Sequence, residues 1–423
     1  MSGVPFSDDD RKGKRSHSLR EAACSIVSQL QGRGHQALFA GGCVRDTLMG
    51  RQPSDYDVAT SAPPETVIGL FKRTQKVGAA FGVVLVRIGR HSIEVATFRR
   101  DASYADGRHP TAVEFTDARE DATRRDFTIN GIFLDPITGQ VIDYVGGRAD
   151  IEARLVRAIG EPSHRFAEDH LRLLRAIRFA ARLDFQIEPA TWRAMQEHAA
   201  HIAKISPERI REELEAILAD QSRARGFQEM CASGLMNYLW PGSDLVAAQQ
   251  ERTLSTLRGL PSDARFELAL AVLLSNLAPD QIAGVCDALR CSNLTKRRVA
   301  WLRRNQDSLL QPARLTLADL KLLMRNESFA DLLSLFRARS LAGGDPLDAY
   351  EAIVARVNSI PPAEIAPPPL LTGHDLAEAG LVRGPRYREI LDTVYYRQLN
   401  GEITSAEEAH LAARAMIDAL ESK

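Results

Sequence analysis

The sequence predicts an α+β protein in which a head with a small mixed sheet precedes an extended all-α arm. Short strand-like apolar runs separated by turn residues fall before position 146, and nearly everything from Ile151 to about residue 345 has helical periodicity. Five prolines within Pro361–Pro369 predict a linker before a last helical segment. We therefore expect a disordered N-terminus at 1–17, a head at 18–145, a neck at 146–215, a helical body at 216–360 and a helical tail at 361–423.

Apolar spacing and turn residues predict the elements of the head. Leu19–Leu30 carries a helical stripe, and Gly41-Gly42 separates a short strand from a helix at Val44–Met49. Arg99–Pro110 is polar and lacks periodicity, which predicts a loop. The predicted strands are Ala37–Ala40, Tyr56–Ala59, Val83–Ile88, Ser92–Phe98, Phe127–Leu134 and Val141–Val145.

The overall composition gives little sign of a nucleic-acid partner. The 423 residues include 54 Lys and Arg against 55 Asp and Glu, for a net charge of −1. The net charge does not reveal the local excess of arginine in two segments, Arg165–Arg182 and Arg290–Arg304. No apolar run approaches the roughly 18 residues of a membrane span, and the five scattered cysteines show neither metal-site spacing nor a disulfide framework. We expect a cytoplasmic protein with no membrane partner, and the sequence does not indicate its oligomeric state.

A pair of carboxylates is the strongest local signal. Asp55 and Asp57 are two residues apart on a predicted strand, so both face the same way and repel each other unless a cation lies between them. Oxygen ligands of this kind suit Mg²⁺. Gly41-Gly42 before a helix exposes backbone N–H groups to a phosphate, and Arg45 can grip a phosphate oxygen. Together they predict nucleotidyl transfer, in which two metal ions activate a hydroxyl and stabilise leaving pyrophosphate.

Order and spacing carry this interpretation, since a lone Asp-x-Asp is usually a solvated strand end. Glu94 is the best candidate for a third carboxylate, although an exposed strand residue is an equal alternative. The glycine pair followed twelve residues later by Asp55 resembles the polymerase-β-like nucleotidyltransferase superfamily.

Further motifs narrow the family. Arg124-Arg-Asp-Phe-Thr-Ile-Asn130, Asp143–Asp150, Arg165–Phe179 and Ser206–Leu214 follow in this order. With the glycine and aspartate motifs, they resemble the class II tRNA nucleotidyltransferases and the bacterial poly(A) polymerases, and the resemblance extends from Gly41 to about Leu214.

Glu168–Arg178 suggests how a base is chosen. Asp169 and Arg172 are three residues apart on one predicted helix, so we expect them to be neighbours on one face. Cytosine and adenine each offer an amine donor beside a ring-nitrogen acceptor, so a carboxylate and a guanidinium together select C and A. The alternative is a row of salt bridges on a solvated helix, but the resemblance implies the same base-reading role.

The resemblance also implies roles for other residues, with CTP and ATP as substrates and Mg²⁺ as the metal. Gly42 and Arg45 would contact the triphosphate. Asp55 and Asp57 would hold the metal. The residues implied to hold ribose or phosphate are Arg125, Asp126, Asn130, Arg175 and Arg178.

The member of the family remains open between CCA addition to tRNA, A addition alone and poly(A) synthesis. The Arg99–Pro110 loop disfavours a CC-adding enzyme, and the lack of a basic C-terminal extension disfavours a poly(A) polymerase. A catalytically silent RNA-binding protein is a further alternative, and the intact carboxylates oppose it. The arm would hold tRNA through a basic run, with a solvated helix face as the alternative. Its candidate residues are Lys296, Arg297, Arg298, Arg303 and Arg304.

Overall fold

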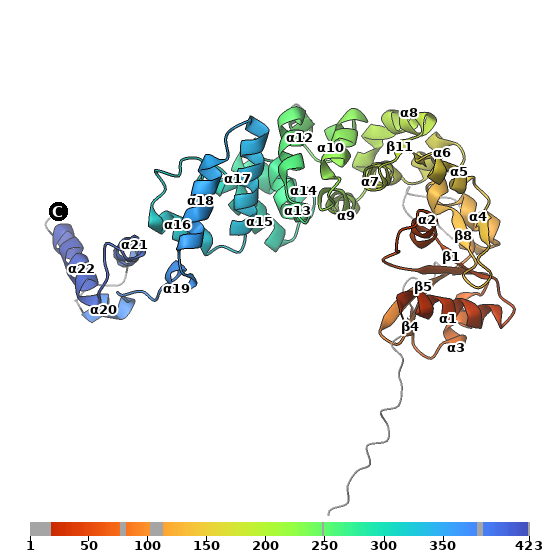
Figure 1. The fold of residues 1–423 in the computed structure, drawn as a ribbon, viewed down its shortest axis with the longest axis horizontal. Helices are drawn as coiled ribbons and strands as arrows, with labels where there is room; N and C mark the ends of the chain where they lie inside the picture. The colour runs from red at the N-terminus through yellow and green to blue at the C-terminus, as the bar shows by residue number, and fades with distance from the viewer. Residues whose placement is uncertain (1–17, 77–81, 102–112, 248, 379–383, 422–423) are drawn as a thin grey trace, which may run out of the picture. The chain divides into compact units, whose positions relative to one another are not determined.

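The computed structural model describes residues 18–76, 82–101, 113–247, 249–378 and 384–421. The chain forms two compact units, Met1–Glu213 with Ala232–Leu239, and Leu214–Cys231 with Trp240–Lys423 (Figure 1). The N-terminus predicted to be disordered and positions 102–110 of the predicted loop lie outside the described residues.

A seven-stranded mixed sheet lies at the centre of the first unit, as the sequence predicts. Its strand order is β3-β4-β5-β2-β1-β8-β9. The β2–β5 pair is parallel, whereas the other described pairs of this sheet are antiparallel. The strands are β1 (Ala37–Ala40), β2 (Asp57–Thr60), β3 (Thr74–Lys76), β4 (Val83–Ile88), β5 (His91–Thr97), β8 (Ile132–Leu134) and β9 (Val141–Asp143).

Helix α1 (Leu19–Gln31) covers part of this sheet. The Ser18 hydroxyl accepts from the Glu21 N–H, and the Glu21 carboxylate accepts from the Ser18 N–H, which caps the helix start. Its apolar stripe joins the buried core of the sheet, where each large aliphatic side chain contributes about 1.5–3 kcal/mol. The buried residues of the helix are Ala22, Ala23, Ile26, Val27 and Leu30.

The rest of the first unit consists of short elements around the sheet and a helical region after it (Figure 1). Before β9 these are α2 (Gly42–Leu48), α3 (Pro64–Leu70), β6 (Arg99–Asp101), β7 (Val113–Phe115), α4 (Ala118–Thr123) and η2 (Thr128–Asn130). After β9 they are α5 (Gly147–Glu152), β10 (Leu155–Val156), α6 (Pro162–Glu168), α7 (Arg172–Leu183), β11 (Gln186–Ile187), α8 (Pro189–His198), η3 (Ala199–Lys204) and η4 (Leu235–Tyr238).

Two of the predicted segments are partly wrong. Within Phe127–Leu134 only Ile132–Leu134 is a strand, because Thr128–Asn130 forms a 3₁₀ turn whose Asn130 side chain donates to Asp126. Arg99–Asp101 begins the predicted loop but forms strand β6, which pairs with β7. That pairing joins residues distant in sequence, so local periodicity does not reveal it.

The second unit is helical throughout its described residues, as predicted. Helix α9 (Pro207–Leu218) contains the residue at which the first unit gives way to the second. A Cβ at Gly259 would lie 3.0 Å from the Ala338 Cα, so α12 and α17 pack closely because Gly259 has no side chain. The helices are α10 (Arg223–Ala232), α11 (Asp244–Ala247), α12 (Gln250–Gly259), α13 (Phe266–Leu273), α14 (Pro279–Ala288), α15 (Asn293–Asn305), α16 (Leu317–Met324), α17 (Phe329–Gly343) and α18 (Asp348–Ser359).

The C-terminal helices form a small core of their own. Helices α20 (Gly373–Glu378), α21 (Pro385–Leu399) and α22 (Ala406–Glu421) follow the proline-rich segment, in which Pro362–Ile365 forms helix α19. Buried side chains from all three helices share one apolar cluster. Across the described residues, none of the helices has both the length and the apolar character that crossing a membrane requires.

Candidate active site

A polar pocket of about 470 Å³ lies within the first unit and brings together most of the predicted site residues. The volume is in the range of small-molecule sites in proteins. Its lining is Gly41, Gly42, Arg45, Asp46, Ser54, Asp55, Asp57, Arg124, Arg125, Asp126, Asn130, Asp169, Arg172, Arg175, Arg178, Phe179 and Arg182. Arginines and aspartates dominate this lining, as a site for a metal-bound polyphosphate requires.

The carboxylates converge where two parallel strands lie side by side. Asp57 is the first residue of β2 and is in register with Glu94 on β5, while Asp55 lies two residues before the strand. Burial, followed by the negative charges of Glu94 and Asp55, raises the pKa of Asp57 to about 6. Asp55 and Asp57 line the pocket, whereas Glu94 is not among the described residues that line it.

The glycine pair leaves backbone close to this carboxylate. Gly41 has φ +74° immediately before α2, a conformation that favours glycine. A Cβ added at Gly41 would lie 3.4 Å from Arg125 Nη1 and 3.8 Å from Asp57 Oδ2. A Cβ here would therefore touch these two groups at ordinary contact distance, and it is the positive φ that favours glycine.

Arg45 is fixed in place on three sides. The residue is 7% exposed, and its Nη1 donates to Asn130 Oδ1 at 2.8 Å. Nε and Nη2 both donate to Asp46 Oδ1, at 2.9 and 2.7 Å. The guanidinium carbon lies 5.4 Å from the centre of the Phe179 ring. Arg45 therefore presents a pre-oriented positive charge at the pocket.

Asp126 belongs to the Arg124–Asn130 motif and bonds to two of the predicted site residues. Its Oδ1 accepts from Asn130 Nδ2 at 3.1 Å, and its Oδ2 accepts from Arg175 Nε at 2.9 Å. Burial acts to raise the pKa of Asp126, but the charge of Arg175 and these hydrogen bonds outweigh it and lower the pKa to about 2. The predicted residues Asp126, Asn130 and Arg175 thus form one ionised network.

Arg125 and Arg178 each pair with a buried acid that sequence reasoning missed. Asp121, 1% exposed, accepts from Arg124 and Arg125 at 2.7 and 3.0 Å. Glu213 accepts from Arg178 Nε at 2.7 Å. Asp121 lies on α4 and Arg125 four residues later, just after that helix ends, and this spacing was an available signal, whereas Glu213 is far from Arg178 in sequence.

Asp169 and Arg172 do not share a helix face, which corrects the prediction. Helix α6 ends at Glu168, Asp169 has an extended backbone with φ −148°, and α7 begins at Arg172. The break turns the two side chains to different partners. The Asp169 carboxylate accepts hydrogen bonds from Nη1 and Nη2 of Arg209, at 3.2 and 2.8 Å. Arg172 Nη1 instead donates to Glu168 at 2.6 Å. Both residues nevertheless line the pocket.

Phe179 is the aromatic centre of the arginine cluster. Its ring lies under the guanidinium groups of Arg45, Arg175 and Arg178, at 5.4, 5.4 and 4.6 Å from the ring centre. Phe179 ends the Arg165–Phe179 motif but was not among the predicted site residues, although it directly follows Arg178. Its ring fixes three cations at one wall without neutralising them.

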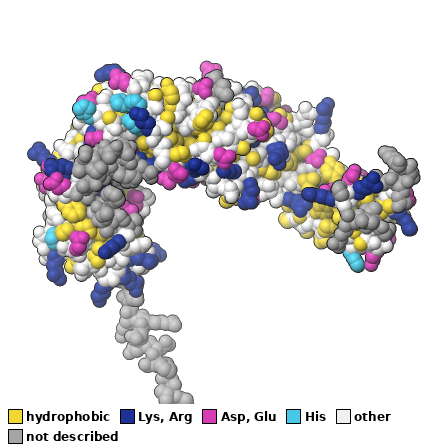
Figure 2. Space-filling model, turned by 180° about the vertical axis from the view of Figure 1, so that it is seen from behind, with side chains coloured by type: hydrophobic (Ala, Val, Ile, Leu, Met, Phe, Trp, Pro, Cys, Tyr) yellow, Lys and Arg dark blue, Asp and Glu magenta, His cyan; other side chains and the backbone are white. Residues whose placement is uncertain are grey.

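The candidate RNA-binding residues lie on α15 of the second unit and are not uniformly available. Lys296 pairs with Asp287, and Arg298 pairs with Glu267 and Glu327 at 3.6 and 3.0 Å. Arg297 and Arg304 are exposed, and Arg303 is half-buried. On the face in Figure 2, basic and acidic side chains are interspersed over the helices of this unit. The basic run in the sequence is therefore partly neutralised in the fold.

Comparisons with known proteins agree with this site. A model of the Poly A polymerase head domain matches residues 37–157, and a model described as a probable RNA and SrmB-binding site of polymerase A matches residues 184–245. A CCA-adding enzyme of Levilactobacillus brevis is 32% identical, over 93% of this chain and 97% of the relative. The chain belongs to the family of CCA-adding enzymes.

Other members of the CCA-adding enzyme family show the same similarity over nearly the whole chain. The enzyme of Geobacillus stearothermophilus is 34% identical, over 92% of this chain and 95% of the relative. The crystal structure of the Bacillus stearothermophilus CCA-adding enzyme in complex with CTP superposes with a TM-score of 0.81 at 30% identity, covering 96% of this chain and 99% of that one. The resemblance seen in the motifs is thus confirmed, and the chain is an enzyme of the nucleotidyltransferase type.

Proposed function

We propose that this chain builds or repairs the 3′-terminal CCA of tRNA, adding C and A from CTP and ATP without a nucleic-acid template and releasing pyrophosphate. One observation carries the proposal: a single pocket contains both the carboxylates Asp55 and Asp57 and the candidate base-reading pair Asp169 and Arg172. The similarity to CCA-adding enzymes along the whole chain supports the choice of reaction.

Asp55 and Asp57 would hold Mg²⁺, with Glu94 as a further candidate. The charges of these residues suit a divalent cation. Burial and the two neighbouring carboxylates raise the pKa of Asp57, and a bound cation would stabilise its ionised form. Bound Mg²⁺ would supply Lewis-acid stabilisation of the triphosphate and of the attacking 3′-hydroxyl. Gly42, Arg45, Arg125 and Arg178 would orient the nucleotide from the other sides.

Hydrogen-bonding capacity supports base reading by Asp169. Its Oδ1 already accepts from the Leu171 N–H and from Arg209 Nη1, whereas among the described residues Oδ2 accepts only from Arg209 Nη2. Each carboxylate oxygen has about two acceptor sites, so Oδ2 keeps one for an exocyclic amine. Uracil and guanine instead carry a carbonyl oxygen at the position of the exocyclic amine. Because this oxygen is also an acceptor, Asp169 Oδ2 would receive no hydrogen bond from these bases.

Arg172 would complete the pair. Its Nη1 uses both N–H groups, on the Arg165 carbonyl at 2.8 Å and on Glu168 at 2.6 Å. Nη2 makes one long bond, at 3.4 Å, to the Arg124 carbonyl. The second Nη2 N–H would donate to the ring nitrogen of cytosine or adenine. Arg175, with Asp126 and Asn130, would hold the sugar and phosphates.

The remaining expectations form part of the same proposal. Residues 18–145 would be the catalytic head, 146–215 the neck, 216–360 the body and 361–423 the tail. Arg297 and Arg304 would contact tRNA phosphates together with Lys296, Arg298 and Arg303. A cytoplasmic location fits a chain whose five cysteines form no disulfide.

The deciding experiment supplies the full chain with tRNA lacking its three terminal residues, together with CTP, ATP and Mg²⁺. The proposal expects products three residues longer, ending in CCA. Other products would instead identify a sister enzyme. A CC-adding enzyme would add only C, and a poly(A) polymerase would produce a long A ladder. An A-adding enzyme would add A, and only to a tRNA that already ends in CC.

A matched pair of variants tests whether nucleotide incorporation depends on the carboxylate site. Asp55→Ala is expected to abolish incorporation while the protein stays folded. Asp280→Ala replaces an exposed aspartate of α14 and is expected to keep full activity. Incorporation by Asp55→Ala at the rate of the wild type would overturn the assignment, and no incorporation by the wild type would favour a silent RNA-binding protein.

A further inference from the structure

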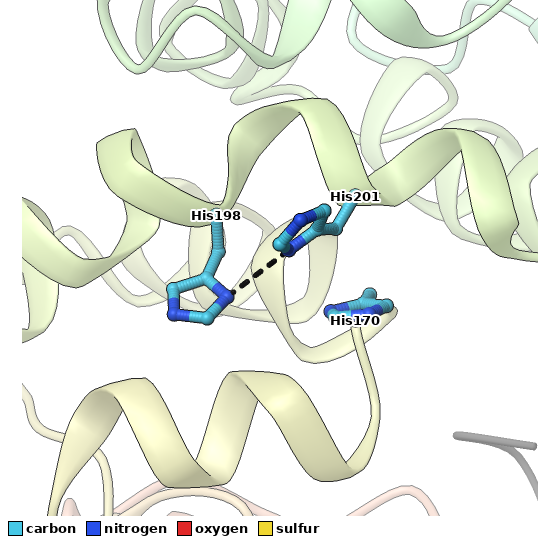
Figure 3. Close-up of side chains that lie close together, drawn as sticks. All are labelled: His170, His198 and His201. Carbon is cyan, nitrogen blue, oxygen red and sulfur yellow. Dashed lines mark hydrogen bonds between the residues drawn. The ribbon is translucent and has the colours of Figure 1, made fainter.

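Three histidines of the first unit lie together in a cluster that the proposed reaction does not use. His170 lies in the break between α6 and α7, His198 is the last residue of α8, and His201 belongs to η3. Figure 3 shows that the three imidazole rings face one another although they come from different elements. One ring nitrogen from each residue lies within 4.8 Å of the other two.

The spacing of two of these rings is that of ligands on one metal ion. His198 Nδ1 and His201 Nδ1 share a hydrogen bond at 3.3 Å, which a bound ion would replace (Figure 3). Two imidazole nitrogens at the usual 2.0–2.1 Å from a tetrahedral zinc ion are also about 3.3 Å apart. The ring centre of His170 lies 5.0 Å from that of His201, and because its ligand nitrogen is within 4.8 Å of the other two, an approach of at most about 1.5 Å completes the same arrangement.

His170 provides a second, independent observation. The residue is 8% exposed, and within the described part of the chain its Nδ1 is buried without a hydrogen-bond partner. A buried polar nitrogen is rarely left unsatisfied in a native protein. A metal ion would satisfy this nitrogen once the ring turns it toward His198 and His201.

The protonation state also suits a metal ligand, because imidazole binds metals in its neutral form. Burial, followed by the charges of His201 and Lys204, lowers the pKa of His170. Burial and then Lys204 likewise lower the pKa of His201. Lys204 is itself a cation that opposes a metal ion, but its side chain is exposed to solvent.

We propose that His170, His198 and His201 form a zinc site, with water as the fourth ligand. Three nitrogen ligands select a transition-metal ion such as Zn²⁺ and distinguish this site from the oxygen ligands of the carboxylate pocket. The ion would link the break that carries Asp169 to the end of α8 and to η3. Its role would be structural, because it would hold the neighbouring Asp169 in place without contacting substrate.

Cobalt binding tests the site directly, because tetrahedral Co²⁺ with nitrogen ligands absorbs strongly in the visible range. The full chain is treated with chelator, given excess Mg²⁺ to occupy the carboxylates, and titrated with Co²⁺ and then Zn²⁺. We expect one equivalent of tetrahedral Co²⁺ that Zn²⁺ displaces. Wild-type protein without these bands would overturn the proposal.

Variants locate the ion. His198→Ala and His201→Ala are each expected to weaken Co²⁺ binding at least tenfold, whereas His374→Ala, at a histidine whose side chain is 81% exposed on α20, is expected to bind as the wild type does. Lys204→Gln should tighten binding because it removes the opposing charge. Equal binding by the wild type and both cluster variants would contradict the proposal.

A melting experiment guards against variants that lose the fold. Both substituted histidines are only half-buried, so circular dichroism is expected to show a native spectrum. Zn²⁺ should raise the melting temperature of the wild type and of His374→Ala, but not of His198→Ala or of the more conservative His198→Gln. A Zn²⁺ shift that persists unchanged in folded cluster variants would place the ion elsewhere.

Discussion

Arg209 grips both carboxylate oxygens of Asp169, with Nη1 to Oδ1 at 3.2 Å and Nη2 to Oδ2 at 2.8 Å. The pair joins the break after α6 to the first turn of α9. A two-bond guanidinium–carboxylate contact fixes orientation as well as position. The candidate base-reading carboxylate is therefore set before a nucleotide arrives.

Replacing Arg209 is expected to loosen base choice. Arg209→Ala removes a charged two-bond contact worth about 1.5–3 kcal/mol and leaves the Asp169 carboxylate free to rotate. We therefore expect the preference for CTP over UTP to fall roughly tenfold or more. Competitive incorporation assays measure this ratio. Arg211→Ala, on the same helix, is the matched control. Unchanged selectivity in Arg209→Ala, with Asp169→Ala also selective, would reject base reading by this carboxylate.

Asp57 predicts a link between metal, pH and stability. Its pKa is about 6 when folded against 3.8 for an ordinary aspartate, so the folded state holds this proton more tightly. For this group, stability without divalent cations is greatest below pH 4 and falls as pH rises to about 6. Asp57→Asn removes that loss and should be more stable than wild type at pH 8 in EDTA, on the order of 1–3 kcal/mol.

Thermal melts at pH 4 and pH 8, with EDTA or with Mg²⁺, measure this effect. The stabilisation by Asp57→Asn should shrink at pH 4, where the wild-type carboxyl is protonated, and also in Mg²⁺, which favours the ionised form. Activity should be lost throughout. A variant that is less stable than the wild type at pH 8 in EDTA would show that repulsion does not dominate this site.

Phe179 is expected to act through the arginines that it touches. Phe179→Leu removes the ring beneath Arg45, Arg175 and Arg178 and should raise KM for the nucleotide about five- to tenfold, with a smaller effect on kcat. Phe179→Tyr keeps the aromatic face and should stay near the wild type. Steady-state kinetics with CTP distinguish the two variants. Equal KM values for Leu and Tyr would assign Phe179 to packing alone.

The exposed arginines of α15 test the tRNA contact. Arg297 and Arg304 are seven residues apart and share a helix face. The double alanine variant should weaken tRNA binding. It should also lower the slope of binding against salt by about the amount expected for two phosphate contacts. Binding is measured across a salt series. Arg388→Ala, at an 88% exposed position on α21, is the control. An unaltered salt slope in the double variant would indicate a solvated helix face.

The fold class was predictable because it depends on local pattern. Apolar alternation placed Val83–Ile88 at its exact bounds, and Ser18 with Glu21 caps the helix that the Leu19–Leu30 stripe predicts. The failures occurred where distant pairing or side-chain bonds override the pattern. Strand β6 needs a partner outside its own segment, and Asn130 bonds to Asp126 within a turn.

The sequence by itself determined the family and the type of enzyme, and the order of its motifs predicted as site residues the carboxylates, the arginines and Asp169 with Arg172. Only the tertiary structure decided how these groups are held. Phe179 lines the pocket, while Arg209 and Glu213 bind the pocket residues Asp169 and Arg178 from positions distant in sequence, and the histidine cluster also joins residues from different elements. Side-chain pairing in space depends on backbone direction at positions such as Asp169, where a helix ends and the one-dimensional spacing no longer predicts which groups meet.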